Sequence, residues 1–112
     1  MQIIGELEKV ENGTSIEQIY PALASGAGTQ FDFTTDEGNY TLIVVINYEA
    51  ERLYYKVKDY AGSLIVKFNT LIEKVNLIAG LVEGYQLQFR NNKFYFGFIE
   101  EDLDALLQAN NQ

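Results

Sequence analysis

The feature that most constrains the fold is a pair of alternating segments, Y-Q-L-Q-F-R and K-F-Y-F-G-F, separated by Asn91-Asn92. Two asparagines can adopt the positive φ angles of a type I′ turn, so the pattern predicts a tight β-hairpin. Counting outward from the turn makes every second facing pair apolar, which predicts that one hairpin face lines the core. The facing pairs are Arg90 with Lys93, Phe89 with Phe94, Leu87 with Phe96, and Tyr85 with Phe98, and the other face holds Gln86, Gln88, Arg90, Lys93 and Tyr95.

The middle of the chain follows the same logic. T-Q-F-D-F-T-T alternates, D-E-G-N turns the chain, and Y-T-L-I-V-V-I-N is typical of a strand buried on both faces. In L-Y-Y-K-V-K-D, every second residue is apolar, and Y-A-G-S supplies the next turn. L-I-V-K-F-N then predicts a strand with Leu64, Val66 and Phe68 on one face and Lys67 pointing away from them.

The remaining segments have weaker patterns. Residues 13–30, which include the small-residue run A-S-G-A-G-T, predict a loop crossing the domain, with one helical turn at 15–20. Residues 71–81 fit either a strand or a short helix. The acidic C-terminus predicts a short helix whose apolar edge is Leu103, Leu106 and Leu107. Six or seven strands result, so the fold class is all-β: a small antiparallel meander curled into a barrel or sandwich, with a short C-terminal helix or tail.

The length of 112 residues predicts a single domain. It consists of an acidic N-terminal strand and loop (1–30), a β core (31–99) and an acidic tail (100–112). Charge is uneven: residues 1–51 hold nine acids and one lysine, a balance of −8, while residues 52–99 hold seven bases and three acids, a balance of +4. This asymmetry favours an acidic end meeting a basic face, within one chain or between copies, or else a solvated surface of uneven charge.

Composition excludes several classes of function. No cysteine or histidine is present, which removes disulfides, zinc sites with sulfur or imidazole ligands, and cysteine or histidine catalysis. The net charge of −8 argues against direct nucleic-acid binding. The longest uncharged run outside the small-residue loop is ten residues, whereas a membrane helix needs about 20. The acidic N-terminus is unlike a signal peptide, so we expect a protein that is kept or assembled in the cytosol.

Carboxylates remain as possible catalytic or metal-binding groups. Glu49 and Glu51 lie on one predicted loop and Asp36 and Glu37 on another, where little burial can raise a carboxyl pKa, so we do not expect them to be catalytic. We expect Glu49, Glu51 and Asp59 to be structural or idle, with Asp59 accepting backbone N–H bonds in the turn at 60–63. Glu100, Glu101, Asp102 and Asp104 lack the spacing of a calcium loop and fit helix N-terminal acids better. G-A-G-T at 26–29 has no following lysine and favours a flexible crossing over a phosphate cradle. We therefore expect no catalytic, metal or cofactor site.

An interface is the more favoured site. Tyr54 and Tyr95 fall on outward strand faces, where tyrosine is common in protein contacts. Lysines and arginines alternate with core residues on the same strands, and would form one positive patch if those strands are neighbours. The candidate interface residues are Tyr54, Lys56, Lys58, Lys67, Arg90, Lys93 and Tyr95. Their acidic partners would be Glu6, Glu8 and Glu11, or the tail of another subunit or a neighbouring protein.

The order of motifs over residues 28–98 resembles the small baseplate plug proteins of contractile-tailed bacteriophages. The order is G-T-Q-F-D-F, Y-T-L-I-V-V-I-N, R-L-Y-Y-K-V-K-D, A-G-S-L-I-V, V-N-L-I-A-G-L and a final strand pair. The chain departs from that family in having Tyr54 where tryptophan is frequent, and in lacking a proline near residues 69–71. The acidic C-terminal tail has no family counterpart that we can name.

The resemblance implies a non-enzymatic structural protein of the virion, assembled in the host cytoplasm, that helps to close the tail lumen at the hub. Its partners would be neighbouring baseplate hub and tail tube proteins, with homo-oligomers possible and with no cofactor, membrane or direct nucleic-acid contact. A different class is a small acidic phage-encoded binding or inhibitor protein acting on a basic host surface. A carboxylate-dependent hydrolase is the third, least favoured class.

Overall fold

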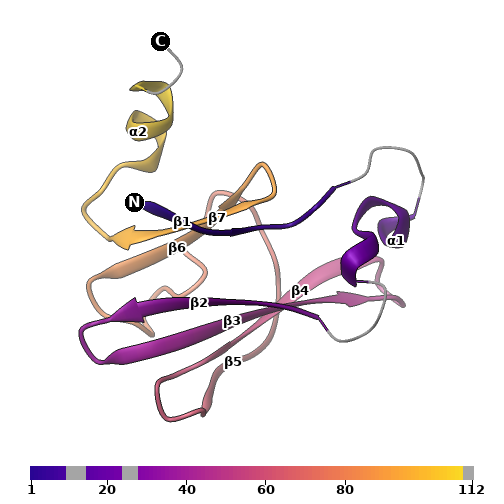
Figure 1. Cartoon of the computed structure of the whole chain (residues 1–112), viewed down its shortest axis with the longest axis horizontal. Coiled ribbons are helices and arrows are strands. Elements are labelled where there is room, and N and C mark those ends of the chain that lie inside the picture. The colour runs from indigo at the N-terminus through magenta and orange to yellow at the C-terminus, as the bar shows by residue number, and fades with distance from the viewer. Residues whose placement is uncertain (10–14, 24–27, 110–112) are drawn as a thin grey trace.

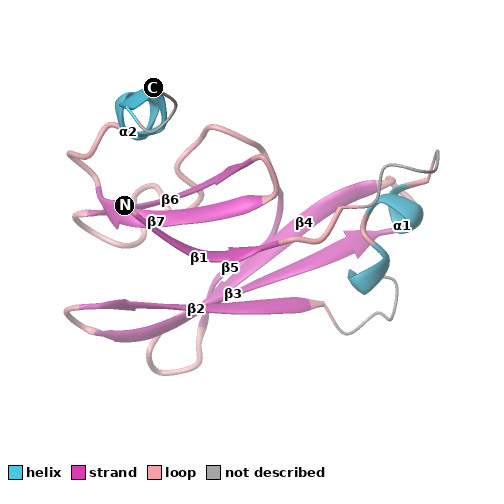
Figure 2. Ribbon diagram, turned by 45° about the horizontal axis from the view of Figure 1, so that its top comes forward, coloured by secondary structure: helices cyan, strands magenta, loops and turns pink. Residues whose placement is uncertain are grey.

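The computed structural model describes residues 1–9, 15–23 and 28–109, which form two antiparallel sheets packed face to face (Figures 1 and 2). The sheets do not close on each other, so the all-β prediction is confirmed in its sandwich form. The elements in chain order are β1 (Gln2–Glu6), α1 (Ile16–Ile19), a 3₁₀ turn (Pro21–Leu23), β2 (Thr29–Thr35), β3 (Gly38–Asn47), β4 (Arg52–Lys58), β5 (Leu64–Thr70), β6 (Tyr85–Arg90), β7 (Lys93–Phe98) and α2 (Leu103–Ala109).

The smaller sheet has the strand order β1-β7-β6. The register of its β6–β7 hairpin is the predicted one, and Asn91 and Asn92 have the expected positive φ angles of 48° and 65°. β1 joins the free edge of β7 with an irregular register between Ile3 and Gly5. The ring of Phe31 lies so close to Gly5 that any Cβ there would overlap it, so glycine lets β1 approach the other sheet.

The larger sheet has the order β2-β3-β4-β5 and contains the predicted meander. One prediction for β3 is wrong, because its side chains are not buried on both faces. Leu42 and Val44 are fully buried, whereas Ile43 and Val45 on the other face are half-buried. The reason is that only the inner side of this sheet meets the other one, as Figure 2 shows.

The predicted face of β5 is also wrong. Val66 is buried opposite Val57, but Phe68 is 44% exposed and stacks on Tyr54, an outward residue of β4. The register shifts twice between β4 and β5, so both Lys67 and Phe68 stand opposite Lys56. A bulge of this kind breaks the strict alternation on which the sequence prediction rested. Leu64, paired with Lys58, is exposed as well.

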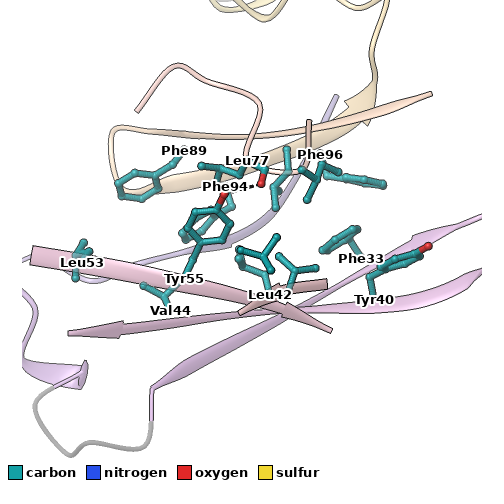
Figure 3. Packing of buried hydrophobic residues seen from close by; sticks show 14 of the residues in the cluster. Phe33, Tyr40, Leu42, Val44, Leu53, Tyr55, Leu77, Phe89, Phe94 and Phe96 are labelled. Atoms are coloured by element: carbon teal, nitrogen blue, oxygen red, sulfur yellow. Dashed lines mark hydrogen bonds between the residues drawn. The ribbon is translucent and has the colours of Figure 1, made fainter. Parts of the chain in front are cut away.

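The core lies between the two sheets (Figure 3). The four hairpin side chains predicted to face it, those of Leu87, Phe89, Phe94 and Phe96, are all buried. Aromatic rings from opposite sheets meet there, with Phe33 and Phe96 4.7 Å apart between centroids. The hydroxyl of Tyr55 donates a 2.7 Å hydrogen bond to the carbonyl oxygen of Leu77, which satisfies a polar group inside this apolar layer.

Residues 71–84 connect the two sheets, and the described structure has neither the strand nor the helix expected at 71–81. The segment runs along β6 instead, where the backbone N–H groups of Lys74 and Leu77 donate to the carbonyls of Phe89 and Leu87. Asn76 Oδ1 accepts from the N–H groups of Ile78 and Leu87, which holds the turn. The interrupted apolar pattern of this segment therefore reflects an irregular cover over a sheet edge.

The helices are short, as predicted. Ser15 caps α1 in a capping box with Gln18, and Tyr20 ends it. In α2, Leu103 is buried, Leu107 is half-buried and Leu106 is 40% exposed, so only part of the predicted apolar edge packs. Residues 13–14 and 24–27 of the predicted crossing loop, which include the first half of G-A-G-T, lie outside the described residues, as does Glu11.

Candidate interaction surface

The seven predicted interface residues lie on two separate surfaces. Tyr54, Lys56 and Lys58 come from β4 and Lys67 from β5, whereas Arg90, Lys93 and Tyr95 come from the β6–β7 hairpin. These strand pairs belong to different sheets, whose outward faces point in opposite directions. A single positive patch would require the β4–β5 and β6–β7 strands to be neighbours, and they are not.

The outer side of the larger sheet carries an aromatic pair. The rings of Tyr54 and Phe68 stack with centroids 4.4 Å apart and planes 15° apart. The cross-strand partner of Tyr54 is Val45, and that of Lys56 is Ile43, both half-buried. We call this surface the β4–β5 face and define it by the residues Ile43, Val45, Arg52, Tyr54, Lys56, Lys58, Lys67 and Phe68.

The bases of the β4–β5 face have no acidic partner within the described part of the chain. The ammonium group of Lys56 lies 5.9 Å from the Phe68 ring centroid, within reach of a cation–π attraction. Among the residues that the structure describes, no ion pair includes Arg52, Lys58 or Lys67. Asp32, the nearest acid in the register, is on β2 and accepts a hydrogen bond from Thr41, which is paired with Lys58. The face is therefore apolar at its centre and positive along β4 and β5.

The outer side of the smaller sheet is covered by the chain itself. Gln86 is buried there, and its amide donates to the carbonyl oxygens of Phe98 (2.9 Å) and Glu101 (2.7 Å). These bonds hold the segment that leads to α2, and Leu103 is buried behind them. Figures 1 and 2 both show α2 on the side of this sheet that faces away from the larger one.

Two ion pairs add to this cover. Arg90 binds Gln88 through Nε and Asp104 of α2 through its guanidinium, which holds the pKa of the Asp104 carboxyl below its usual value. The N-terminal ammonium lies 2.9 Å from Glu101 Oε1 and lowers the pKa of that carboxyl. Part of the acidic tail thus meets a base of the β6–β7 hairpin within one chain. This agrees with the first of the two predicted arrangements, in which an acidic end meets a basic face within one chain. Glu6 stands opposite Lys93 in the register of β1 and β7.

Sequence reasoning missed the pockets at one end of the sandwich. Three pockets of about 350, 170 and 510 Å³ share Tyr85, whose ring stacks on Phe96 and Phe98. Burial and then nearby Asp36 raise the pKa of the Tyr85 hydroxyl. The largest pocket is lined by Leu81, Val82 and Ile99, with Glu37 and Glu83 among its polar residues. Its wall comes from the irregular 71–84 segment, so no periodic pattern could have indicated it.

Of the carboxylates considered for catalysis, Glu49 and Glu51 line none of these three pockets, whereas Asp36 and Glu37 line the smallest and Glu37 also lines the largest. Glu49 and Glu51 are exposed on the turn between β3 and β4. Asp59 Oδ1 accepts hydrogen bonds from the N–H groups of Ala61 and Ser63, both at 2.9 Å, as predicted for that turn. Within residues 1–9, 15–23 and 28–109, no group of three or more acids converges as a metal site would require. The same residues contain no helix long and apolar enough to cross a membrane.

Comparison of the chain with protein-family models, with curated proteins and with solved structures gave no match.

Proposed function

We propose that this chain is a non-enzymatic structural protein of a phage tail or baseplate, and that it acts by binding neighbouring proteins through the β4–β5 face. The observation that carries the binding role is the composition of that face on an otherwise acidic chain. The exposed ring of Phe68 stacks there on the half-buried ring of Tyr54, beside bases that form no ion pair among the described residues. Tyrosine and arginine, present on this face as Tyr54 and Arg52, are among the residues that most often concentrate binding energy in protein interfaces.

The resemblance of residues 28–98 to baseplate plug proteins supports the phage setting. Those residues span β2 to β7, so most of the motifs of the resemblance fall on strands, whereas V-N-L-I-A-G-L lies in the irregular segment 71–84. In this proposal the chain is assembled in the host cytoplasm, becomes part of the virion, and contacts hub and tube proteins at the tail axis. No cofactor takes part.

Mass spectrometry of purified particles tests the setting, with particles from a phage whose genome encodes the chain. We expect the protein in the virion, and its gene among the tail genes. Its absence from particles together with expression early in infection would overturn the proposal and favour an inhibitor of a host protein.

A pair of matched variants tests the surface. Lys56→Gln on the β4–β5 face should reduce incorporation into particles, whereas Lys93→Gln on the smaller sheet should leave it unchanged. Each variant replaces one outward lysine on a strand that has a neighbouring strand on both sides, so we expect similar small changes in the free energy of unfolding. Equal incorporation of the two variants would remove the β4–β5 face from the proposal.

A further inference from the structure

We infer that the β4–β5 face binds the C-terminal end of a second copy of this chain, so that copies associate head to tail. This inference rests on the proposed function, because it names one partner of the same face.

The C-terminal end offers the complementary chemistry. Ile99 is 59% exposed and Leu106 is 40% exposed, and between them lie the exposed acids Glu100 and Asp102. Leu106 donates its backbone N–H to the carbonyl of Asp102, so the two side chains lie one helical turn apart on the same side of α2. We call this set of four residues the acidic end. Asp104 is excluded from it because Arg90 already binds that carboxylate.

The β4–β5 face matches the acidic end in both respects. Its apolar centre, with Phe68 44% exposed, can cover Ile99 and Leu106. Lys56, Lys58 and Lys67, which form no ion pair among the described residues, can meet Glu100 and Asp102. The contact would repeat between copies what happens within one copy, where the C-terminal segment covers the outer side of the smaller sheet. A short helix laid on a sheet face is also a common way to bury such a face.

The two surfaces cannot meet within one molecule. The β4–β5 face points away from the smaller sheet, whereas α2 lies on the far side of that sheet (Figures 1 and 2). Each copy therefore presents one unused surface of each kind. A contact between two different surfaces is heterologous, and it produces rings or open chains instead of closed two-fold dimers.

Sedimentation of the purified full chain across protein concentration and salt provides the first test. We expect species larger than dimers that grow with concentration and shrink as salt is raised above about 0.1 M, where the Debye length is about 10 Å. A chain that stays monomeric at high concentration and low salt would overturn the inference. An association that stops at dimers would overturn it too, because a heterologous contact does not stop there.

Two neutral variants locate the surfaces. Lys56→Gln with Lys58→Gln changes only the β4–β5 face, and Glu100→Gln with Asp102→Asn changes only the acidic end. Asparagine at 102 keeps the cap that Asp102 Oδ1 makes with the N–H of Ala105. Loss of about two exposed charge contacts should weaken association by about 2- to 30-fold in each variant. Unchanged association in either variant would remove that surface from the inference, and circular dichroism would check that both are folded.

Mixing the two variants gives the sharpest result. Each pair can still form one complete contact, between the intact acidic end of the first and the intact β4–β5 face of the second. We expect heterodimers that do not extend at concentrations where each variant alone is mostly monomeric. A mixture no larger than its components would overturn the inference. Particle incorporation is measured separately, so a monomeric chain that still enters virions would refute self-association while leaving the proposed function standing.

Discussion

The two sheets of this sandwich bury their inner sides in the same way and differ in what happens on their outer sides. On the smaller sheet, Gln86 and Leu103 are buried and Arg90 is paired with Asp104, because the C-terminal segment folds back over the strands. On the larger sheet, Phe68 is exposed and its neighbouring bases have no partner in the described chain. The same chain thus contains one outer surface that is already satisfied and one that is not. The outer side of the larger sheet is therefore the surface where a binding partner would bury the most exposed apolar area and pair the most bases.

The core shared by the sheets gives the largest expected effect. Phe94 is fully buried, and its ring lies 4.7 Å from that of Phe89 and 5.2 Å from that of Phe31. Phe94→Ala should lower the free energy of unfolding by about 3–5 kcal/mol. The matched change on the open surface, Phe68→Ala, removes one stacked pair and should cost about 0.5–1.5 kcal/mol. Denaturant midpoints measure both, and equal losses would contradict the contrast between core and open face.

The covered surface of the smaller sheet gives a smaller effect. Gln86→Ala removes the amide that binds the carbonyls of Phe98 and Glu101, and should cost about 1–3 kcal/mol. Gln30 is an exposed glutamine on the outer side of the larger sheet, and Gln30→Ala should stay within about 0.5 kcal/mol.

Hydrogen exchange separates a local effect of Gln86→Ala from a global one. The amides of residues 98–106 should exchange faster in this variant. The amides of β3 should change only by the amount that the loss of global stability predicts. Unchanged exchange at 98–106 would mean that the C-terminal segment is held by other contacts.

Sequence reasoning reached the fold where side-chain alternation is regular and failed where the backbone departs from it. The β6–β7 register followed from counting outward from Asn91-Asn92, because each facing pair on such a hairpin is set by the turn. Regular alternation through L-I-V-K-F-N predicts that Phe68 shares a face with Val66, and no residue type in that segment marks the β4–β5 bulge that turns Phe68 toward Tyr54.

The candidate site shows the same division. Tyr54 and the β4 lysines could be placed outward from sequence, since they alternate with Leu53, Tyr55 and Val57. Arg90 and Lys93 lie on a different surface from Tyr54 because the two sheets stack with their outer sides apart. This stacking is a long-range property of the fold that local sequence patterns do not encode. The stacking partner of Tyr54 and the pockets around Tyr85 depend on the bulge and on the irregular 71–84 segment, so they could not be inferred from local pattern.

The ion pair on the covered side predicts a pH dependence. The hydrogen bond from Arg90 lowers the pKa of the Asp104 carboxyl below the ordinary value of 3.8, so the folded carboxyl stays ionised to lower pH than the unfolded one. Its stabilising contribution is therefore present above pH 3.8 and is lost as pH falls through the folded pKa. The stability difference between the wild type and Asp104→Asn should shrink over this acidic range. NMR titration of the carboxyl checks the cause, and a midpoint at or above 3.8 would contradict it.

The turn at the end of the open sheet gives the smallest expected effect. Glu49 and Glu51 are exposed between β3 and β4, and the described residues show no ion pair to either carboxylate. Replacing both by glutamine keeps their size and removes two charges, so unfolding free energy should change by no more than about 0.5 kcal/mol. The double variant should also associate as the wild type does, because neither residue belongs to the β4–β5 face or to the acidic end. A larger stability change would show that the turn packs against a neighbour. If screening with broad hydrolase substrates found an activity that this variant lacks, the carboxylates would be functional, and the non-enzymatic role proposed for the chain would be wrong.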